Sequence, residues 1–473
     1  MIMNLFKPYY ASLFLFLFFA CQAKKHEQAK PNIILIYVDD YGWRDVGFNG
    51  SQFYETPHID QLAADGMTFT NAYANAPNCA PSRACLLSGQ YSPRHGIYTV
   101  NSSERGDKAQ RKIIPIPNKT TLDTGVLTMA EALKPAGYTS VSIGKWHLGE
   151  APYTGPKGQG FDINIGGTHK GHPKSYFSPY QNPKLQDGPE GEYLTDRLNE
   201  EAIRFIEQHQ EAPFFMYLTH FAVHTPIQGK KELTEKYNHK PVVDEQKNAE
   251  YAAMIESVDQ GVGKIVEKLK ALNLYQNTMI VFYSDNGGHG VVTSNKPLRG
   301  SKGMLYEGGI RVPMSVTWPE KIQARTRSEV PVIGTDLFPS FLEAAGLKKP
   351  EEKILDGESL FPLLTQSGPL QREAIYWHFP AYLEAYHPSQ GAFRITPAGA
   401  IRKGDYKLIE YFEEGRFELF NLKEDLEESQ NLIAKEPAKL QELKLLMSQW
   451  RQAIQAPVPM EPNPDYIVRE DVR

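Results

Sequence analysis

The chain has 473 residues, of which 41% are hydrophobic and 23% are charged, and its formal net charge at pH 7 is -5. A chain of this length and hydrophobic content can bury a large core, so the composition excludes a disordered protein and predicts two or three domains. The negative net charge argues against a nucleic-acid binder, because such proteins need a basic surface to neutralise phosphates.

The first 21 residues have the pattern of an export signal. Lys7 precedes an apolar run, residues 11–20, which ends at Cys21. This run is long enough for a signal peptide but short for a membrane span. A small residue followed by cysteine resembles a bacterial lipobox, although Phe18 stands where leucine is usual, so Cys21 is a candidate lipidation site. Cleavage of an ordinary signal peptide nearby is the alternative. Either way, we expect an exported bacterial protein, periplasmic or held at the outer membrane only by a lipid anchor, with residues 22–30 as a polar tether.

From Pro31 onward, short apolar runs are followed by polar clusters. Four such runs, residues 33–38, 138–143, 213–218 and 279–283, include few polar residues and do not alternate, as expected of strands buried on both faces of a parallel sheet. The side chains that follow them are Asp39 and Asp40, Lys145 and His147, His220 and His224, and Asp285 and Asn286. Ligands of open α/β sheets bind at the carboxyl ends of the strands, so we expect these clusters to converge on one crevice.

Helices are predicted between these strands. Thr128 and Glu131 have the spacing of a capping box, and Gly137 is the expected end of that helix. Residues 248–272 carry apolar side chains at steps of three and four, as in a long amphipathic helix. The fold class predicted is therefore α/β, with a large, mostly parallel sheet flanked by helices.

The composition changes after Thr365. Residues 374–412 are rich in aromatic and charged residues, residues 413–420 resemble a hairpin, and residues 437–454 form an amphipathic pattern. We therefore predict that residues 31–365 form the larger, N-terminal domain, which carries the polar clusters at the strand ends. Residues 366–473 are predicted to form a smaller subdomain, an antiparallel sheet covered by one helix.

Asp39, Asp40, Asp285 and Asn286 offer only hard oxygen ligands, which suit Ca²⁺ or Mg²⁺ better than zinc. Capping or turn roles are the alternative for such residues. One divalent cation, Ca²⁺ or Mg²⁺, is the cofactor we expect.

The run Cys79-Ala80-Pro81-Ser82-Arg83, with Leu86-Leu87-Ser88-Gly89 after it, resembles the signature at which type I sulfatases have their cysteine oxidised to formylglycine. The chain from about Pro31 onward is similar to these sulfatases, which belong to the alkaline-phosphatase-like superfamily. Further matches occur in the family's order: residues 31–42, 56–60, 144–149, 224–226, 285–288 and 299–303. Tyr41 replaces the usual leucine and Ser88 the usual threonine.

This resemblance implies a mechanism. Cys79, once converted to formylglycine (3-oxoalanine) by a maturase, would be the nucleophile and a fifth metal ligand. Arg83 would hold its alkoxide form, and Lys145 and Lys302 would neutralise charge on the sulfate. His147 would act as the base during sulfate release, and His224 would protonate the leaving alcohol.

The three cysteines of the chain then leave no disulfide. If Cys21 carries lipid and Cys79 is modified, Cys85 has no partner. It is predicted to be a small packed side chain.

The resemblance implies a sulfated glycan as the substrate, and we expect an algal polysaccharide such as ulvan, carrageenan or fucan before a glycosaminoglycan. Basic residues in two loops are candidates for contacts with it, although such clusters are more often solvated surface. The candidate contacts are Arg94, His95, Arg105, Lys108, Arg111, Lys112, His169, Lys170, His172, Lys174, His289 and His378. Trp377 and Phe379 would form a sugar platform or simply pack.

Two other functions remain open from the sequence. Related hydrolases with a similar cysteine motif cleave phosphonates or phosphodiesters. The second alternative is a lipoprotein that binds glycans but has lost catalytic activity, although no catalytic position of the family is missing from the sequence.

Overall fold

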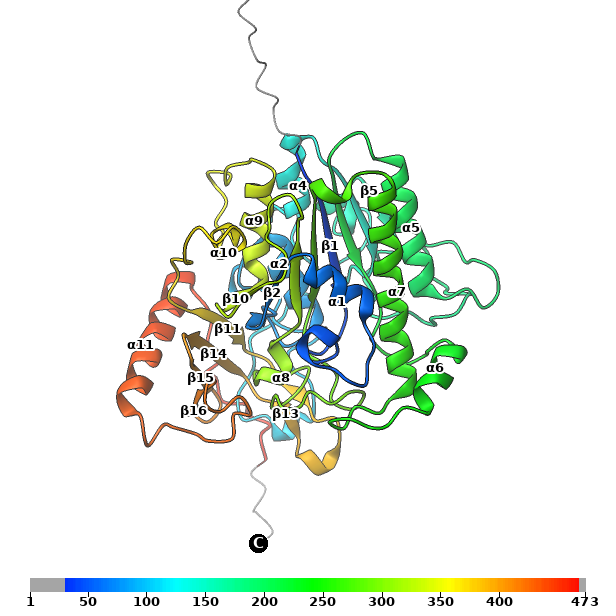
Figure 1. The fold of residues 1–473 in the computed structure, drawn as a ribbon. Coiled ribbons are helices and arrows are strands. Elements are labelled where there is room, and N and C mark those ends of the chain that lie inside the picture. Colours follow the sequence, from blue (N-terminus) through cyan, green and yellow to red (C-terminus); the bar gives the residue numbers. More distant parts are fainter. Residues whose placement is uncertain (1–29, 468–473) are drawn as a thin grey trace, which may run out of the picture.

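The computed structural model describes residues 30–467. The predicted signal segment with Cys21, and the tether up to residue 29, lie outside the described residues. The main element is an eight-stranded sheet in the order β5-β4-β6-β1-β7-β8-β2-β9 (Figure 1). Its strands are β1 (Asn32–Val38), β2 (Met67–Phe69), β4 (Thr139–Gly144), β5 (Ile163–Ile165), β6 (Phe214–Thr219), β7 (Thr278–Ser284), β8 (Met314–Thr317) and β9 (Thr326–Ser328).

The centre of this sheet is parallel and buried on both faces. Strand β1 pairs with β6 on one side and with β7 on the other, so that Ile34 lies opposite Met216 and Ile280. Every residue of β1, β6 and β7 is buried, which explains why these runs show no alternation. Strand β8 is antiparallel to both of its neighbours, so the sheet is mixed and mostly parallel. The predicted fold class is confirmed.

Helices cover both faces of the sheet (Figure 1). Ile34 and Ile36 point into a core shared with α1, α5 and α7, while Ile33 and Leu35 point into a core shared with α2, α4 and α9. The helices are α1 (Pro57–Ala64), α2 (Cys79–Ser88), α3 (Ser92–His95), α4 (Met129–Leu133), α5 (Leu194–Gln208), α6 (Lys231–Asn238), α7 (Ala249–Ala271), α8 (Glu307–Ile310), α9 (Leu337–Ala344), α10 (Phe361–Leu364) and α11 (Pro437–Ile454). Within residues 30–467, no helix combines the length and apolarity needed to cross a membrane.

Local signals set the ends of two predicted helices. The Asn248 side chain accepts a hydrogen bond from the Tyr251 amide at 3.1 Å, so α7 begins where the sequence predicted. Thr128 and Glu131 form the predicted capping box. Helix α4 is short, however, because Pro135 lacks an amide hydrogen, and the chain continues as a 3₁₀ turn to Gly137. Gly137 has a φ of +83°, which suits glycine.

A smaller antiparallel sheet follows, in the order β11-β14-β15-β16. Its strands are β11 (Ile375–Phe379), β14 (Ala398–Lys403), β15 (Tyr406–Tyr411) and β16 (Arg416–Asn421). The predicted hairpin at residues 413–420 is the turn between β15 and β16 together with most of β16. Leu408 packs on α11, and Ile409 on the opposite face packs toward the main body of the molecule. The small sheet is therefore held between α11 and the main body of the molecule.

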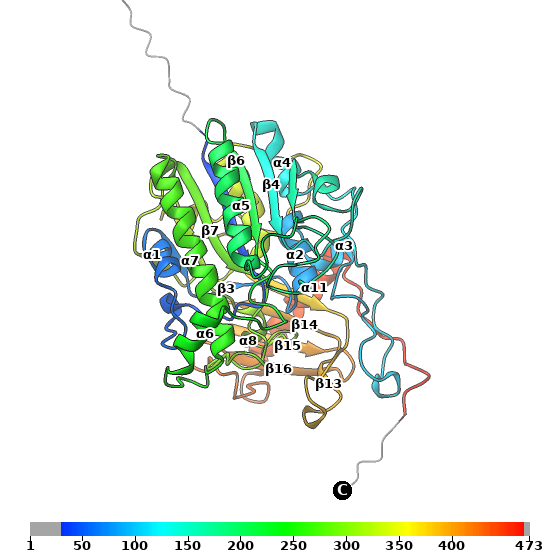
Figure 2. The same ribbon diagram turned by 90° about the vertical axis from the view of Figure 1, so that its right-hand side faces the viewer.

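Two short strand pairs complete the fold: β3 (Ala72–Tyr73) with β10 (Val332–Ile333), and β12 (Leu383–Glu384) with β13 (Phe393–Ile395). Figure 2 shows the small sheet below the main sheet, on the side where β1, β6 and β7 end. Side chains from β12, β13 and the loop between them line a cavity at that end of the main strands.

Candidate active site

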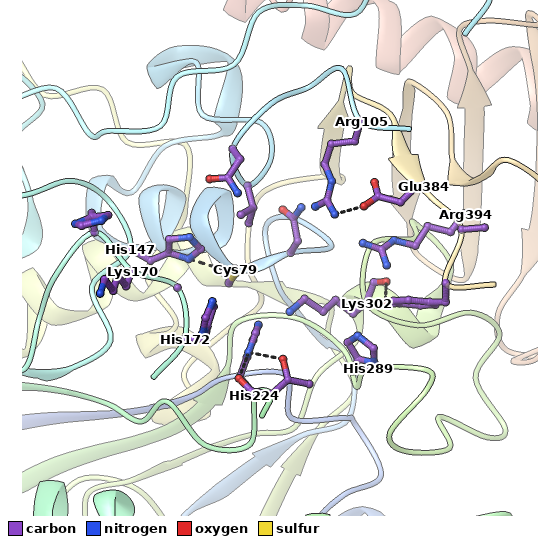
Figure 3. Close-up of a pocket in the computed structure, with 18 residues that line it drawn as sticks. Cys79, Arg105, His147, Lys170, His172, His224, His289, Lys302, Glu384 and Arg394 are labelled. Atoms are coloured by element: carbon purple, nitrogen blue, oxygen red, sulfur yellow. Dashed lines mark hydrogen bonds and ion pairs between the residues drawn. The ribbon is translucent and has the colours of Figure 1, made fainter. Parts of the chain in front are cut away.

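The polar clusters at the four strand ends come together as predicted. Because β4, β6, β1 and β7 are neighbours and parallel, their carboxyl ends lie side by side. The backbone links them directly: the Asp285 amide donates to the Val38 carbonyl at 3.2 Å, and the Lys145 amide to the Thr219 carbonyl at 2.8 Å. A cavity of about 610 Å³ opens above these ends (Figure 3). His220, by contrast, is buried away from the cavity.

Cys79 lies at the wall of this cavity as the first residue of α2. Its Sγ is 3.4 Å from Nδ1 of His147 (Figure 3). Burial raises the pKa of the Cys79 thiol above its usual value, although Lys145 and Lys302 act in the opposite direction. The unmodified thiol is therefore held in its protonated form and is a weak nucleophile.

Arg83 is one helical turn after Cys79 and is fully buried. Its Nε and Nη2 donate to Oδ2 of Asp285 at 3.0 and 2.8 Å, and its Nη1 donates to Oγ1 of Thr219 at 2.8 Å. Arg83 therefore fixes Asp285 in place. None of its hydrogen bonds in the described structure goes to Cys79, where the predicted contact with the alkoxide would lie.

Four side chains at the strand ends form what we call the acidic cluster. Each exposes at most 1% of its surface to solvent: Asp39, Asp40, Asp285 and Asn286. Ligand atoms of Asp39, Cys79 and Asp285 lie within 4.8 Å of one another. Oδ1 of Asp39 and Oδ1 of Asn286 are buried without a hydrogen-bond partner. Leaving acceptors unpaired in the interior is costly. Two unpaired oxygens beside three carboxylates therefore fit a hard divalent cation.

The electrostatics of the acidic cluster point the same way. Burial and the neighbouring Asp285 raise the pKa of the Asp39 carboxyl well above its usual value, although Lys145 is an ion-pair partner. Asp40 is also buried, but the charge of Lys302 holds its pKa well below the usual value. At Asp39, therefore, the positive charge of Lys145 does not balance the negative charge of the neighbouring carboxylates. Asp40 has a φ of +59°, an uncommon conformation for a residue other than glycine, and such strain is concentrated at functional sites.

The two predicted catalytic lysines occupy different positions. Lys302 lines the cavity, and its Nζ is 2.6 Å from Oδ1 and 2.8 Å from Oδ2 of Asp40. Lys145 is fully buried against Asp39 and does not line the cavity. Lys302 can therefore contact a bound anion directly. Lys145 can influence the site only through its ion pair with Asp39.

His147 and His224 both line the cavity. His224 Nδ1–H donates to the Thr225 carbonyl at 2.9 Å, which leaves Nε2 facing the cavity, 3.8 Å from Oδ2 of Asp40. Burial lowers the pKa of each histidine well below its usual value, helped at His147 by Lys145 and at His224 by Lys302. A neutral His147 suits a proton acceptor. His224 must gain a proton before it can act as a donor.

Three predicted substrate contacts do not reach the cavity. Arg94 is paired with Asp356, with Nε 2.8 Å from a carboxylate oxygen. His95 lies against Cys85, and His378 Nε2–H donates to the Pro457 carbonyl at 2.7 Å. Burial lowers the pKa of each of these histidines to about 3. The structure therefore places Arg94, His95 and His378 outside the cavity, where these side chains take part in packing and ion pairing.

The remaining candidates divide in the same way. Arg105, His169, Lys170, His172 and His289 line the cavity, whereas Lys108, Arg111, Lys112 and Lys174 do not. Trp377 is buried and donates to the Ala74 carbonyl at 2.8 Å, so it packs rather than forming a sugar platform. Cys85 is buried, as predicted.

Sequence reasoning missed one wall of the cavity. Glu384, Tyr386 and Arg394, from the β12–β13 region, line the cavity. Figure 3 shows Glu384 and Arg394 opposite His147 and Lys170 across it. These residues follow no motif. The only signal was the abundance of aromatic and charged residues after position 374.

Comparison with known proteins agrees with this site. A profile of the sulfatase family matches residues 31–347, and one described as the C-terminal part of N-sulphoglucosamine sulphohydrolase matches residues 300–455. A sulfatase of Formosa agariphila is 34% identical over 88% of this chain and 87% of its own. Human N-acetylgalactosamine-6-sulfatase is 34% identical over 73% of this chain and 68% of its own. The crystal structure of Ps i-CgsB in complex with k-i-k-neocarrahexaose has a TM-score of 0.74 and 34% identity, and the match covers 89% of this chain and 92% of that one.

Proposed function

The chain belongs to the sulfatase family and is a sulfuric ester hydrolase acting on sulfated carbohydrates, and on this premise we propose that it desulfates an algal polysaccharide through a formylglycine at Cys79 and a bound divalent cation. The observation that best supports the proposal is the pair of unpaired oxygens, Oδ1 of Asp39 and Oδ1 of Asn286, buried beside Cys79. A cation held by Asp39, Asp40, Asp285, Asn286 and the modified Cys79 would stabilise negative charge on the sulfate, with Ca²⁺ preferred and Mg²⁺ second.

The modified side chain supplies the nucleophile. Hydrated formylglycine carries two hydroxyl groups on one carbon, so one oxygen can attack sulfur and the other can later expel sulfate and regenerate the aldehyde. A serine in this place would leave a stable sulfate ester. The high pKa of the Cys79 thiol agrees with a residue that works only after oxidation.

The chain's own residues then position the sulfate and move protons. Lys302 lines the cavity and neutralises charge that develops on the sulfate oxygens, and Lys145 supports it from behind Asp39. His147, whose Nδ1 is 3.4 Å from Sγ of Cys79, accepts the proton of the second hydroxyl during release. His224 presents Nε2 to the cavity and donates a proton to the departing sugar oxygen. The negative charge of a bound sulfate favours the protonated form that this step needs.

An algal polysaccharide such as ulvan, carrageenan or fucan, or an oligosaccharide from one, is the proposed substrate. The cavity supports this choice because Arg105, Lys170 and Arg394 line it, with His169, His172 and His289. Cationic walls around a sulfate site suit a polymer that carries repeated negative charge. Glycosaminoglycans, which share this property, are the next class to test.

Export and maturation are part of the proposal. We propose that Cys21 is lipidated and holds the enzyme at the periplasmic side of the cell envelope or on the outer membrane. Metabolic labelling with a palmitate analogue tests this, with Cys21→Ser as the variant that should lose the label. A formylglycine-generating maturase is the protein partner that Cys79 requires.

The decisive experiment combines mass spectrometry with sulfate release. Protein made together with a formylglycine-generating enzyme should carry an aldehyde or its hydrate at position 79 and an intact thiol at Cys85. It should release sulfate from one or more sulfated algal oligosaccharides, and Cys79→Ala should abolish release, whereas Cys85→Ala should retain it. Much faster hydrolysis of phosphodiesters than of any sulfate ester would favour the rival hydrolase. Glycan binding without sulfate release from aldehyde-bearing protein would favour a binding protein.

A further inference from the structure

The Arg394 guanidinium stands out among the cations around the cavity. It makes no hydrogen bond or ion pair with the described residues 30–467. Its Nε is buried without a partner, and its guanidinium carbon lies 4.2 Å from the centre of the Tyr386 ring. Arg394 is partly buried, and because a buried donor without an acceptor is costly, its Nε and the cavity beside it leave room for an anion that comes from outside the chain.

The other cations that line this wall are already neutralised. Lys302 is paired with Asp40, and Arg105 is paired with Glu384. Arg394 therefore carries the one positive charge of this wall, formed by Arg105, Lys302, Glu384, Tyr386 and Arg394, that has no counter-charge in contact. Lys170, on the opposite wall, is exposed to solvent and pays no comparable cost.

The position of Arg394 relative to the sulfate site follows from Gly303, the residue after Lys302. A Cβ atom on Gly303 would lie 2.5 Å from Nε of Arg394, so the guanidinium packs directly on this backbone. The hydroxyl of Tyr386, whose ring contacts Arg394, donates to the Lys302 carbonyl at 2.7 Å. Figure 3 shows Arg394 and Lys302 side by side on the same wall. A substrate whose sulfate contacts Lys302 would therefore present its neighbouring groups to Arg394.

We propose that Arg394 binds a second anionic group of the substrate, a sulfate or a carboxylate on the same sugar or on the adjoining one. This inference rests on the proposed function and narrows it to glycans with two closely spaced negative charges. The planar guanidinium can form two parallel hydrogen bonds with either group. Tyr386 supports the guanidinium from one face, and the Arg105–Glu384 pair closes the wall beside it.

The test compares three matched sulfated disaccharides: one with a single sulfate, one with a second sulfate and one with a uronate carboxylate. For the native enzyme we expect a KM at least tenfold lower for a substrate with a second anion. In Arg394→Gln the ratio of the two KM values should fall to about one, and Arg394→Lys should restore part of it. The arm that shows the effect, sulfate or carboxylate, identifies the group. If both variants fold but the native ratio persists, or if the native ratio is itself about one, the inference is wrong.

A matched control comes from another Arg–Tyr pair. Arg416 lies 3.9 Å from the centre of the Tyr411 ring on β15, outside the cavity, and Arg416→Gln should keep the native ratio. Calorimetric binding to Cys79→Ala protein separates this inference from the proposed function. If no disaccharide is desulfated but the doubly charged ones bind tenfold more tightly, and Arg394→Gln removes that preference, the anion site stands and the proposed function fails. Sulfate release without such a preference overturns the anion site alone.

Discussion

Two buried groups of charged and polar side chains in this molecule differ in whether their oxygens have partners. The acidic cluster, Asp39, Asp40, Asp285 and Asn286, lies at the ends of the main strands. The joint cluster, which we define as Glu307, Lys407 and Glu428, lies where the small sheet packs on the main body. All three of its side chains are fully buried.

In the joint cluster every carboxylate oxygen is satisfied. Lys407 Nζ is 2.9 Å from Oε1 of Glu307 and 2.8 Å from Oε1 of Glu428. The second oxygen of Glu307 accepts from the Tyr73 hydroxyl at 2.7 Å, and that of Glu428 accepts from the Glu307 amide at 2.7 Å. In the acidic cluster, Oδ1 of Asp39 and Oδ1 of Asn286 have no partner.

This difference shows how a functional site can be told apart from a structural one. Burial does not separate the two clusters, and neither does a raised pKa. Burial raises the pKa of Glu428 to about 7, and it also raises that of Asp39. The unpaired oxygens and the adjoining cavity do separate them. A group of charges that completes its own hydrogen bonds holds the fold together, whereas an incomplete one is arranged for a ligand.

The largest effect that would test this contrast is removal of the proposed cation. Dialysis against a chelator should lower the rate of sulfate release at least 1000-fold and should lower the unfolding temperature, because the acidic cluster loses its counter-charge. Adding Ca²⁺ or Mg²⁺ should restore both, and the better of the two identifies the ion. Metal-free protein, verified by elemental analysis, that keeps its activity would contradict the assignment of the acidic cluster.

Substitution of Lys407 should have the opposite pattern. Lys407→Met removes the lysine shared by two buried carboxylates and leaves Glu428 without a basic partner, although Arg311 still pairs with Glu307 at 3.3 Å. We therefore expect a loss of about 3–5 kcal/mol in the free energy of unfolding. The activity of the folded enzyme should change less than twofold, since Lys407 does not line the cavity. Chemical denaturation measures the loss. Lys403→Met is the matched control, because Lys403 is partly exposed at the end of β14 and should cost less than 1 kcal/mol. A loss of activity as large as the loss of stability would show that the joint cluster is more than structural.

The acidic cluster was predictable from the sequence because it depends on local patterns and one topological rule. Buried strands have no alternation, and the residues after parallel strands share one edge of the sheet. Knowing that Asp39–Asp40 and Asp285–Asn286 follow such strands is enough to bring them together. The capping box at Thr128 and the boundaries of α7 and α11 were predictable in the same way.

The Arg394 wall was not predictable, and neither was the joint cluster. The Arg394 wall depends on how a two-residue strand, β12, and a three-residue strand, β13, pack against loops far away in the sequence. Segments so short carry no periodicity. The joint cluster brings together Glu307 of the four-residue helix α8, Lys407 of β15 and Glu428 of the loop after β16. His95 and His378 were assigned to the substrate because a histidine beside basic or aromatic residues has the same local pattern whether it is buried or exposed. Only the packing shows that they are buried.

Within the active site, His224 should matter according to the leaving group. We expect His224→Ala to lower kcat/KM on a sugar sulfate about 100-fold, because a sugar alkoxide leaves poorly without a proton. The loss on an activated aryl sulfate should be tenfold smaller. Steady-state kinetics on both substrates measures the ratio, and His239→Ala, at an exposed position, is the control. Equal losses on the two substrates would remove His224 from its role as the acid and leave it a binding residue.

The smallest expected effect concerns the pH dependence of the joint cluster. Burial raises the pKa of Glu428 from 4.5 to about 7, so between these pH values the folded protein binds a proton that the unfolded chain has released. The stability that Glu428 contributes is therefore fully present below about pH 4.5 and is lost as the pH rises through 7. In Glu428→Gln this loss is absent. Relative to the native protein, the free energy of unfolding of the variant should therefore rise by on the order of 1–2 kcal/mol between pH 4.5 and 7.

Chemical denaturation at several pH values measures this difference in the free energy of unfolding. The samples should be free of metal, because cation binding at the acidic cluster also depends on pH. Parallel curves for the two proteins would mean that Lys407 keeps Glu428 ionised throughout, and the joint cluster would then be a permanent ion pair that does not titrate in this range.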